Sequence, residues 1–156
     1  YPFMKRITYW PQLFLGLTFN WGIVMSWTAM TNNISFEIII LYIAAMFWTL
    51  GYDTIYGTQD MYDDEIIGLK STSIKFKKNI KLFVSVSYFL STFLIAGLFY
   101  NQLGLNYFTF LFIIFVLSLM YQIIKFKKNN PKECLQAFKL NGVAGFLLFF
   151  GIFLTN

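Results

Sequence analysis

The sequence predicts an all-α membrane protein with about five transmembrane helices. Of its 156 residues, 58% are hydrophobic and only 12% are charged, whereas soluble domains carry about 25% charged residues. Twenty phenylalanines, ten tyrosines and four tryptophans give an aromatic content typical of lipid-facing and interfacial surfaces. Several uncharged stretches approach or exceed the roughly 20 apolar residues that cross a bilayer. We therefore expect the lipid bilayer, and no nucleic acid, as the large partner of this chain.

Five apolar runs are candidate spanning helices, at residues 11–30, 36–51, 82–100, 107–124 and 140–154. The second and fifth runs are short for a full span, so their helices are expected to extend into the flanking loops. Neighbouring runs are separated by polar segments at residues 31–33, 101–106 and 129–131.

Every lysine and arginine lies on one side of this predicted topology. The N-terminal segment and the connections after the second and fourth runs hold all twelve: Lys5, Arg6, Lys70, Lys75, Lys77, Lys78, Lys81, Lys125, Lys127, Lys128, Lys132 and Lys139. Because positive residues mark the cytoplasmic side, the N-terminus and both basic connections are expected to face inward. Five spans then place the C-terminus outside.

Residues 52–73, here called the acidic loop, hold five of the seven acidic residues. Within it, Asp53, Asp60 and Asp64 are spaced so that they would share one face of a helix continuing from the second span. Carboxylates gathered in this way repel one another unless a cation lies between them. On spacing alone, a solvated acidic loop stays the open alternative to a bound cation. Asp63 and Glu65 point elsewhere and are expected to be solvated or hydrogen-bonded to neighbours.

The type of metal is narrowed by what the chain lacks. Histidine is absent and Cys134 is the single cysteine, so imidazole sites and an intrachain disulfide are excluded. Oxygen ligands favour Mg²⁺, which binds one or two carboxylates together with water and phosphate oxygens. We expect Cys134, in a lysine-rich loop, to be a reduced bystander.

Cations lie near these carboxylates. Lys70 follows Asp64 closely, and Lys5 and Arg6 are expected on the same membrane face. Ser71 or Thr72 is a candidate N-cap whose helix would present phosphate-facing N–H groups. Carboxylates for Mg²⁺ and cations for phosphates suit a diphosphate-bearing lipid. The lysines from Lys75 to Lys81 are interpreted instead as topology determinants.

Two further features of the spans stay open at this stage. Asn20 lies in the middle of the first span, where a polar side chain facing lipid is costly, so it either lines a cavity or bonds to another helix. Glu37 is expected at the outer interface. The sequence does not distinguish the aromatic rings that line a cavity from the rings that contact lipid.

Residues 52–72, with Asp60 and Asp64 four apart and Lys70-Ser71-Thr72 at the end, resemble the second aspartate-rich motif of UbiA-type intramembrane aromatic prenyltransferases. Residues 1–12 and 15–22 look like the branch that prenylates 4-hydroxybenzoate. Residues 134–145 are similar to the last loop and helix of that branch. The resemblance covers nearly the whole chain.

This resemblance implies a bundle of nine transmembrane helices, of which residues 1–156 would be the C-terminal part of a single domain. Asp60 and Asp64 would be the catalytic carboxylates that bind Mg²⁺, with Asp53 added by the spacing argument above. Lys5, Arg6 and Lys70 would hold the diphosphate. The first aspartate-rich motif of the family is absent, so the chain alone is expected to be inactive and to belong to a longer protein. The chain begins at Tyr1, without an initiator methionine or a signal peptide pattern.

The implied reaction is Mg²⁺-dependent transfer of a polyprenyl group from polyprenyl diphosphate to the ring of 4-hydroxybenzoate, in ubiquinone biosynthesis. The expected location is the bacterial inner membrane with a cytoplasmic acidic loop, or else the mitochondrial inner membrane with the loop in the matrix. Three alternatives stay open: another acceptor such as homogentisate, dihydroxynaphthoate or haem, a membrane transporter, and a non-catalytic remnant. Transport sites usually place ionisable groups within the membrane, whereas these acids lie at its edge.

Overall fold

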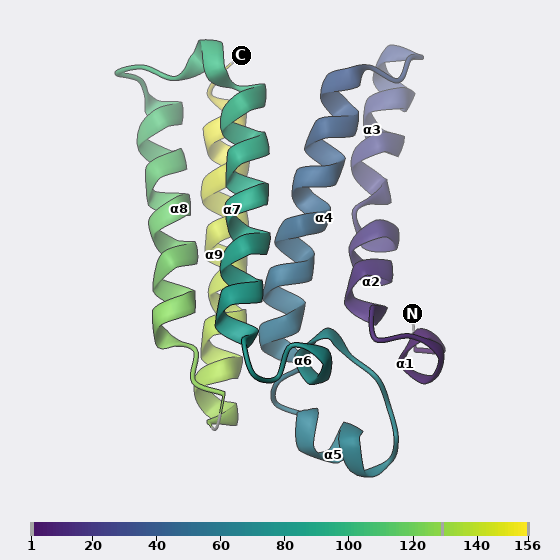
Figure 1. The fold of residues 1–156 in the computed structure, drawn as a ribbon. Helices are drawn as coiled ribbons and strands as arrows, with labels where there is room; N and C mark the ends of the chain where they lie inside the picture. The colour runs from purple at the N-terminus through teal and green to yellow at the C-terminus, as the bar shows by residue number, and fades with distance from the viewer. Residues whose placement is uncertain (1, 129, 156) are drawn as a thin grey trace.

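The computed structural model describes residues 2–128 and 130–155, so Tyr1 of the N-terminal motif and Asn129 of the last polar segment lie outside it. The described part is helical, without strands, and includes five helices or helix pairs long and apolar enough to cross a membrane (Figure 1). The predicted fold class is confirmed. In chain order the elements are α1 (Met4–Ile7), α2 (Pro11–Phe19), α3 (Trp21–Thr31), α4 (Phe36–Tyr56), α5 (Met61–Ile66), α6 (Thr72–Lys75), α7 (Ile80–Leu98), the 3₁₀ turn η1 (Tyr100–Gln102), α8 (Tyr107–Lys125) and α9 (Pro131–Phe153).

The two short runs extend as expected. α4 continues to Tyr56 rather than ending at residue 51, and α9 begins at Pro131 rather than at residue 140. The α9 start follows local sequence, because Asn130 accepts a hydrogen bond from the Glu133 N–H (3.4 Å) and proline suits the first helical position. The expectation that Cys134 lies in a loop is therefore wrong. Its buried thiol lies in the first turn of α9.

The first span consists of two helices that meet at Asn20. The Asn20 backbone closes α2 through the Gly16 carbonyl (3.4 Å), and its side-chain amide donates to that same carbonyl (2.8 Å). The amide also donates to the Thr49 hydroxyl of α4, at 2.8 Å. Asn20 therefore forms the interhelical hydrogen bond that was one of its two expected roles, and it joins α2 to α4 at membrane depth.

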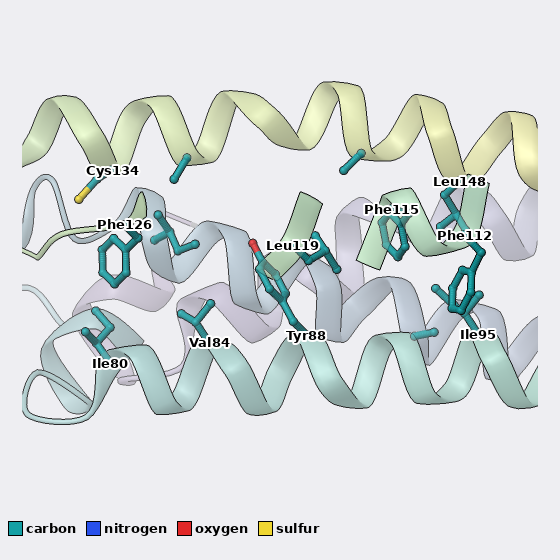
Figure 2. Close-up of a cluster of buried hydrophobic side chains, with 14 of the residues drawn as sticks. Ile80, Val84, Tyr88, Ile95, Phe112, Phe115, Leu119, Phe126, Cys134 and Leu148 are labelled. Atoms are coloured by element: carbon teal, nitrogen blue, oxygen red, sulfur yellow. The ribbon is translucent and has the colours of Figure 1, made fainter. Parts of the chain in front are cut away.

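The helix α4 is the centre of the bundle. It packs against α2 and α3 on one side and against α7 and α9 on the other, while α8 packs mainly on α9 (Figure 1). The core lies among α4, α7, α8 and α9. Figure 2 shows its buried side chains from the last three helices and the ends adjoining them: Ile80, Val84, Tyr88, Ile95, Phe112, Phe115, Leu119, Phe126, Cys134 and Leu148.

The two ends of the bundle differ in charge. The N-terminus and the C-terminus lie at opposite ends, and α1, α5 and α6 all lie at the N-terminal end (Figure 1). The basic connections, the starts of α7 and α9 and the end of α8 are at this same end. The opposite end has the turn after α3 and the hairpin between α7 and α8, which carry no lysine or arginine.

Labelling of single cysteines tests the orientation of the bundle. Leu105→Cys places a thiol in the exposed α7–α8 hairpin, and Gly68→Cys places one in the exposed part of the acidic loop. In right-side-out vesicles, a membrane-impermeant maleimide is expected to label residue 105 and to label residue 68 only after lysis. Native Cys134, which is fully buried, serves as the silent background. Labelling of residue 68 in intact vesicles would reverse the orientation.

The contact between α4 and α7 requires a glycine. A Cβ atom added to Gly51 would lie 2.5 Å from Cε1 and 2.6 Å from Cδ1 of Tyr88. Tyr88 cannot move aside easily, because it is buried and its hydroxyl donates to Oε1 of Gln122 at 2.7 Å. Close approach of the two helices at this point therefore depends on the missing side chain.

We expect Gly51→Ala to destabilise the protein by about 1–3 kcal/mol, because the added methyl group displaces the Tyr88 ring from a packed core. Gly22→Ala in α3 is the matched control, since a Cβ atom there meets nothing within 4 Å. That control is expected to be neutral or slightly stabilising. The measurement is the midpoint of thermal unfolding in detergent. Equal midpoints for the two variants would show that α4 and α7 are not in close contact here.

Candidate functional site

The acidic loop is not one helix. α4 ends at Tyr56, where the Gly57 N–H closes the helix on the Asp53 carbonyl at 2.8 Å, and α5 begins only at Met61. A Cβ atom on Gly57 would lie 2.9 Å from the Ser73 hydroxyl and 3.1 Å from the Gln12 amide nitrogen. The chain turns here because other segments pack directly against its backbone. The expectation that Asp53, Asp60 and Asp64 share one continuous helix is therefore wrong.

The three carboxylates divide into one residue and one pair. Asp53 is buried in the last turn of α4. Asp60 is the exposed residue before α5, and Asp64 lies one turn later with 5% of its surface exposed. The Asp64 N–H donates to the Asp60 carbonyl at 2.8 Å. Across residues 2–128 and 130–155, no three acidic, histidine or cysteine side chains are grouped closely enough to hold a metal ion.

One of the three predicted cations, Lys5, contacts this pair of carboxylates, and a second, Lys70, is bonded to the segment that carries Lys5. The Lys5 ammonium forms an ion pair with Oδ2 of Asp64 at 2.9 Å, and both side chains are largely shielded from solvent. The Lys70 N–H donates to the Lys5 carbonyl at 2.7 Å, and its ammonium donates to the Ile7 carbonyl at 3.1 Å. Residues far apart in sequence, from α1, α5 and the segment before α6, therefore meet at one point.

The third cation, Arg6, adjoins a hollow at the same place. A cavity of about 440 Å³ is lined by Lys5 and Arg6 together with Pro2, Phe3 and Leu69. Arg6 is exposed and has no ion pair within the part of the chain that the structure describes. Since Lys5 is paired with Asp64, Arg6 is the cation of this lining without an ion pair among the described residues, and diphosphate binding by Lys5, Arg6 and Lys70 stays a prediction.

The role expected for the start of α6 is only partly confirmed. Ser71 caps this helix by accepting a hydrogen bond from the Ile74 N–H at 3.2 Å. The Thr72 N–H, however, donates to Oε1 of Gln12 at 3.0 Å and is not directed at a ligand. α6 has four residues, and Ser71, Thr72 and Ser73 are buried. The expectation of phosphate-facing N–H groups at this terminus is therefore wrong for both of these donors.

Gln12 is a residue of this site that the sequence reasoning missed. It lies at the start of α2 with 1% of its surface exposed, and it receives the Thr72 N–H. The Thr72 hydroxyl also bonds to the Thr54 hydroxyl of α4 at 2.7 Å, and the Ser73 hydroxyl donates to the Thr54 carbonyl at 2.8 Å. This buried network fastens the end of the acidic loop to α2 and α4. A glutamine at the boundary of an apolar run was the available signal.

The remaining charges near the loop have other partners. Glu65 forms an exposed ion pair with Lys77, with Oε1 at 2.8 Å, and therefore points away from Asp64. The Lys75 ammonium lies 4.4 Å from the centre of the Trp10 ring. Asp63 is exposed. These positions agree with the separation of Asp63 and Glu65 from the predicted metal ligands.

A second, open cavity lies on the surface of the bundle. It has a volume of about 320 Å³ and lies among α2, α4 and α9. We call it the aromatic cavity; its lining comprises Phe19, Asn20, Trp48, Thr49, Tyr52, Phe138, Lys139, Asn141 and Gly142. The sequence could not select these rings from the many others. Asn141, a polar residue in an apolar run, was a signal that the sequence reasoning did not use.

Replacing Lys5 tests the junction of α1 and α5. In Lys5→Met the Asp64 carboxylate stays buried without its ion-pair partner, which is unfavourable. We expect backbone amides of residues 60–70 to exchange hydrogen at least about tenfold faster, a moderate figure because part of the pair is reached by solvent. Lys77→Met, which breaks the exposed pair with Glu65, is the control and is expected to change exchange little. Unchanged exchange in Lys5→Met would show that the pair does not hold the loop.

Comparison with known proteins places this geometry in a family. The family model described as "UbiA prenyltransferase family" matches residues 1–153. The chain is 41% identical to a mitochondrial 4-hydroxybenzoate polyprenyltransferase of Bos taurus, over all of the chain and 42% of that protein. It is 41% identical to the Aedes aegypti protein of the same name, over 99% of the chain and 35% of that protein. A 4-hydroxybenzoate octaprenyltransferase of Coxiella burnetii is 38% identical over the whole chain and 54% of its own length. The chain thus spans about a third to a half of these relatives, and no solved structure matches it. It belongs to the UbiA prenyltransferase family.

Proposed function

We propose that this chain provides the C-terminal part of an enzyme that transfers a polyprenyl group from polyprenyl diphosphate to 4-hydroxybenzoate in ubiquinone biosynthesis. Relatives about 40% identical over the whole chain carry the names of that activity. The observation that carries the proposal is the ion pair of Asp64 with Lys5, whose backbone is in turn bonded to Lys70, at one end of a bundle of candidate membrane spans. A polyprenyl diphosphate needs a charged site for its anionic leaving group and an apolar site for its lipid tail, and the two must adjoin.

The cations would bind and stabilise the diphosphate. Lys5 and Arg6 line the 440 Å³ cavity, and Lys70 is fixed against the backbone of the same segment. Negative charge grows on the diphosphate as the allylic bond breaks. Fixed positive charges in a partly shielded site stabilise that change more than mobile solvent does.

The carboxylates fit the Mg²⁺ ligand set common in phosphate-binding enzymes, in which one or two carboxylates bind the ion together with water and phosphate oxygens. Asp60 and Asp64 are one helical turn apart and offer oxygen ligands, and a further set of ligands would come from water and phosphate. When bound, Mg²⁺ would neutralise charge on the diphosphate leaving group. Asp53 stays a prediction for this site, but the helical spacing that suggested it does not exist. Asp64 is neutralised by Lys5 in the present structure.

The remaining parts of the proposal concern the whole protein. The chain would act only together with further helices, because it spans less than two thirds of its relatives. The membrane would be the bacterial inner membrane or the mitochondrial inner membrane. Relatives of both kinds are similar to the chain over its full length.

The proposed function is tested by co-expressing this chain with the N-terminal half of a relative. Membranes are supplied with radiolabelled 4-hydroxybenzoate, a polyprenyl diphosphate and Mg²⁺. We expect prenylated product only when both halves and Mg²⁺ are present. Absence of product from correctly inserted and assembled halves would contradict the proposal, and product from homogentisate or dihydroxynaphthoate instead would reassign the acceptor.

In that system, Asp60→Asn and Asp64→Asn are expected to lower the rate of prenyl transfer at least about 100-fold, the scale of losing one strong electrostatic contact to a transition state. Glu65→Gln is the matched control, because this neighbouring acid is paired with Lys77. It is expected to stay within a few-fold of the unchanged protein. Membrane insertion is followed for each variant, and near-normal transfer by both aspartate variants would end their assignment as ligands.

A further inference from the structure

The aromatic cavity has a mixed chemical lining. Four aromatic rings, two carboxamides and one ammonium group surround its 320 Å³, a volume at the lower end of small-molecule sites. Its lining comes from α2, α4 and α9, which are distant in sequence. The two carboxamides bond to Thr49 and Trp48, which leaves the Lys139 ammonium as the charged member of the lining.

Trp48 is held in this wall by a hydrogen bond from another helix. Its indole N–H donates to Oδ1 of Asn141 at 3.0 Å. The other end of that amide is also engaged, because Nδ2 of Asn141 donates to the Phe138 carbonyl at 2.9 Å. The amide orientation is therefore fixed, and with it the position of the indole ring. The indole N–H is the only polar group of the ring, so this hydrogen bond fixes the direction in which that edge of the ring faces.

The rings form a rigid wall. The planes of Trp48 and Tyr52 meet at 85° with centroids 6.1 Å apart, and Trp48 meets Phe115 of the core at 86° and 5.2 Å. Phe138 meets Tyr52 at 60° and 5.8 Å. Edge-to-face packing of this kind is the favoured geometry for aromatic pairs. A displacement of Trp48 would therefore disturb both the cavity wall and the core behind it.

The wall lies next to the proposed diphosphate site. Tyr52 directly precedes Asp53, and Phe138 also packs on Tyr56, the last residue of α4, with centroids 4.8 Å apart. The helical rise from Trp48 to Tyr56 is about 12 Å. A small ligand in the cavity would therefore lie within about two helical turns of the acidic loop, on the membrane side.

The lining indicates which substrate would occupy the cavity. The two carboxamides are already bonded to Thr49, Trp48 and backbone carbonyls. The ammonium group is the polar member of the lining to which a hydrocarbon prenyl chain offers no partner. Lys139 is exposed and has no ion pair within residues 2–128 and 130–155, and its neighbour Phe138 packs on Tyr56 at the end of α4. An exposed ammonium group that lines an aromatic cavity is available to an anionic ligand. An aromatic carboxylic acid supplies a ring for the wall and an anion for the ammonium.

We propose that the aromatic cavity binds the acceptor, with the ring of the aromatic acid against Trp48 and Tyr52 and its carboxylate on Lys139. Asn141 is then a positioning residue that acts through Trp48. This inference rests on the proposed function, because it places the second substrate of that reaction.

The first experiment compares Trp48→Phe and Asn141→Leu in the assembled two-part protein. Each removes one end of the same hydrogen bond, so each is expected to raise the KM for 4-hydroxybenzoate about tenfold and to leave the KM for the polyprenyl diphosphate within twofold. The double variant is expected to be no worse than either single variant, because the two residues act as a unit. Trp27→Phe in α3, which makes the same exchange at an exposed ring, is the control.

The second experiment removes the proposed carboxylate partner. The unchanged protein is expected to prefer 4-hydroxybenzoate to its methyl ester, and Lys139→Met is expected to lose that preference. Lys132→Met, at the exposed start of α9, is the matched control and should keep it. A preference that survives in Lys139→Met would remove this residue from the site.

A binding measurement separates failure of this inference from failure of the proposed function. 4-Hydroxybenzoate is expected to quench tryptophan fluorescence of the folded protein, and Trp48→Phe should lose most of the quenching while Trp27→Phe keeps it. This result would support the cavity even if no prenyl transfer were seen. Quenching that survives in Trp48→Phe would overturn the proposal. So would a raised KM for the prenyl donor with an unchanged KM for the acceptor.

Discussion

The structure depends on one constraint, which is that the interior of a bilayer offers no water to polar groups. Polar side chains in the spans therefore bond to one another across helices. Asn20 bonds to Thr49, Trp48 to Asn141, and Tyr88 to Gln122. These pairs connect α2 with α4, α4 with α9, and α7 with α8. They fix which faces of the helices meet, because apolar side chains alone pack about as well against lipid as against one another.

The same constraint explains why the charged groups collect at one end. The acidic loop leaves the bundle at Gly57, and its return is held by Gln12, Thr54 and Thr72 in a buried network. Lys5 then neutralises Asp64 across the junction. An acidic carboxylate and its counter-ion are thus kept at the membrane edge, where an ionic substrate can reach them without entering the hydrocarbon region.

The sequence predicted what depends on composition, and it failed where packing decides. Five spans and their charge asymmetry follow from long apolar runs, and the meeting of Lys5 with Asp64 was anticipated by placing both on one membrane face. The break after Tyr56 was not anticipated, because it arises from Ser73 and Gln12 packing against the Gly57 backbone. The sequence did not predict the aromatic cavity either. Rings such as Trp48 become distinct from lipid-facing rings only when a partner on a distant helix is known.

Lys139 differs from the other lysines in its position, because it lines the aromatic cavity. Several lysines lie in connections or engage a partner, as Lys77 does with Glu65 and Lys5 does with Asp64. Lys139 instead borders a cavity whose two carboxamides already satisfy Thr49 and Trp48. The Lys139 ammonium is exposed and has no ion-pair partner among the described residues. In the proposed acceptor site, its partner would be the carboxylate of the aromatic acid, at the place where the aromatic wall approaches the acidic loop.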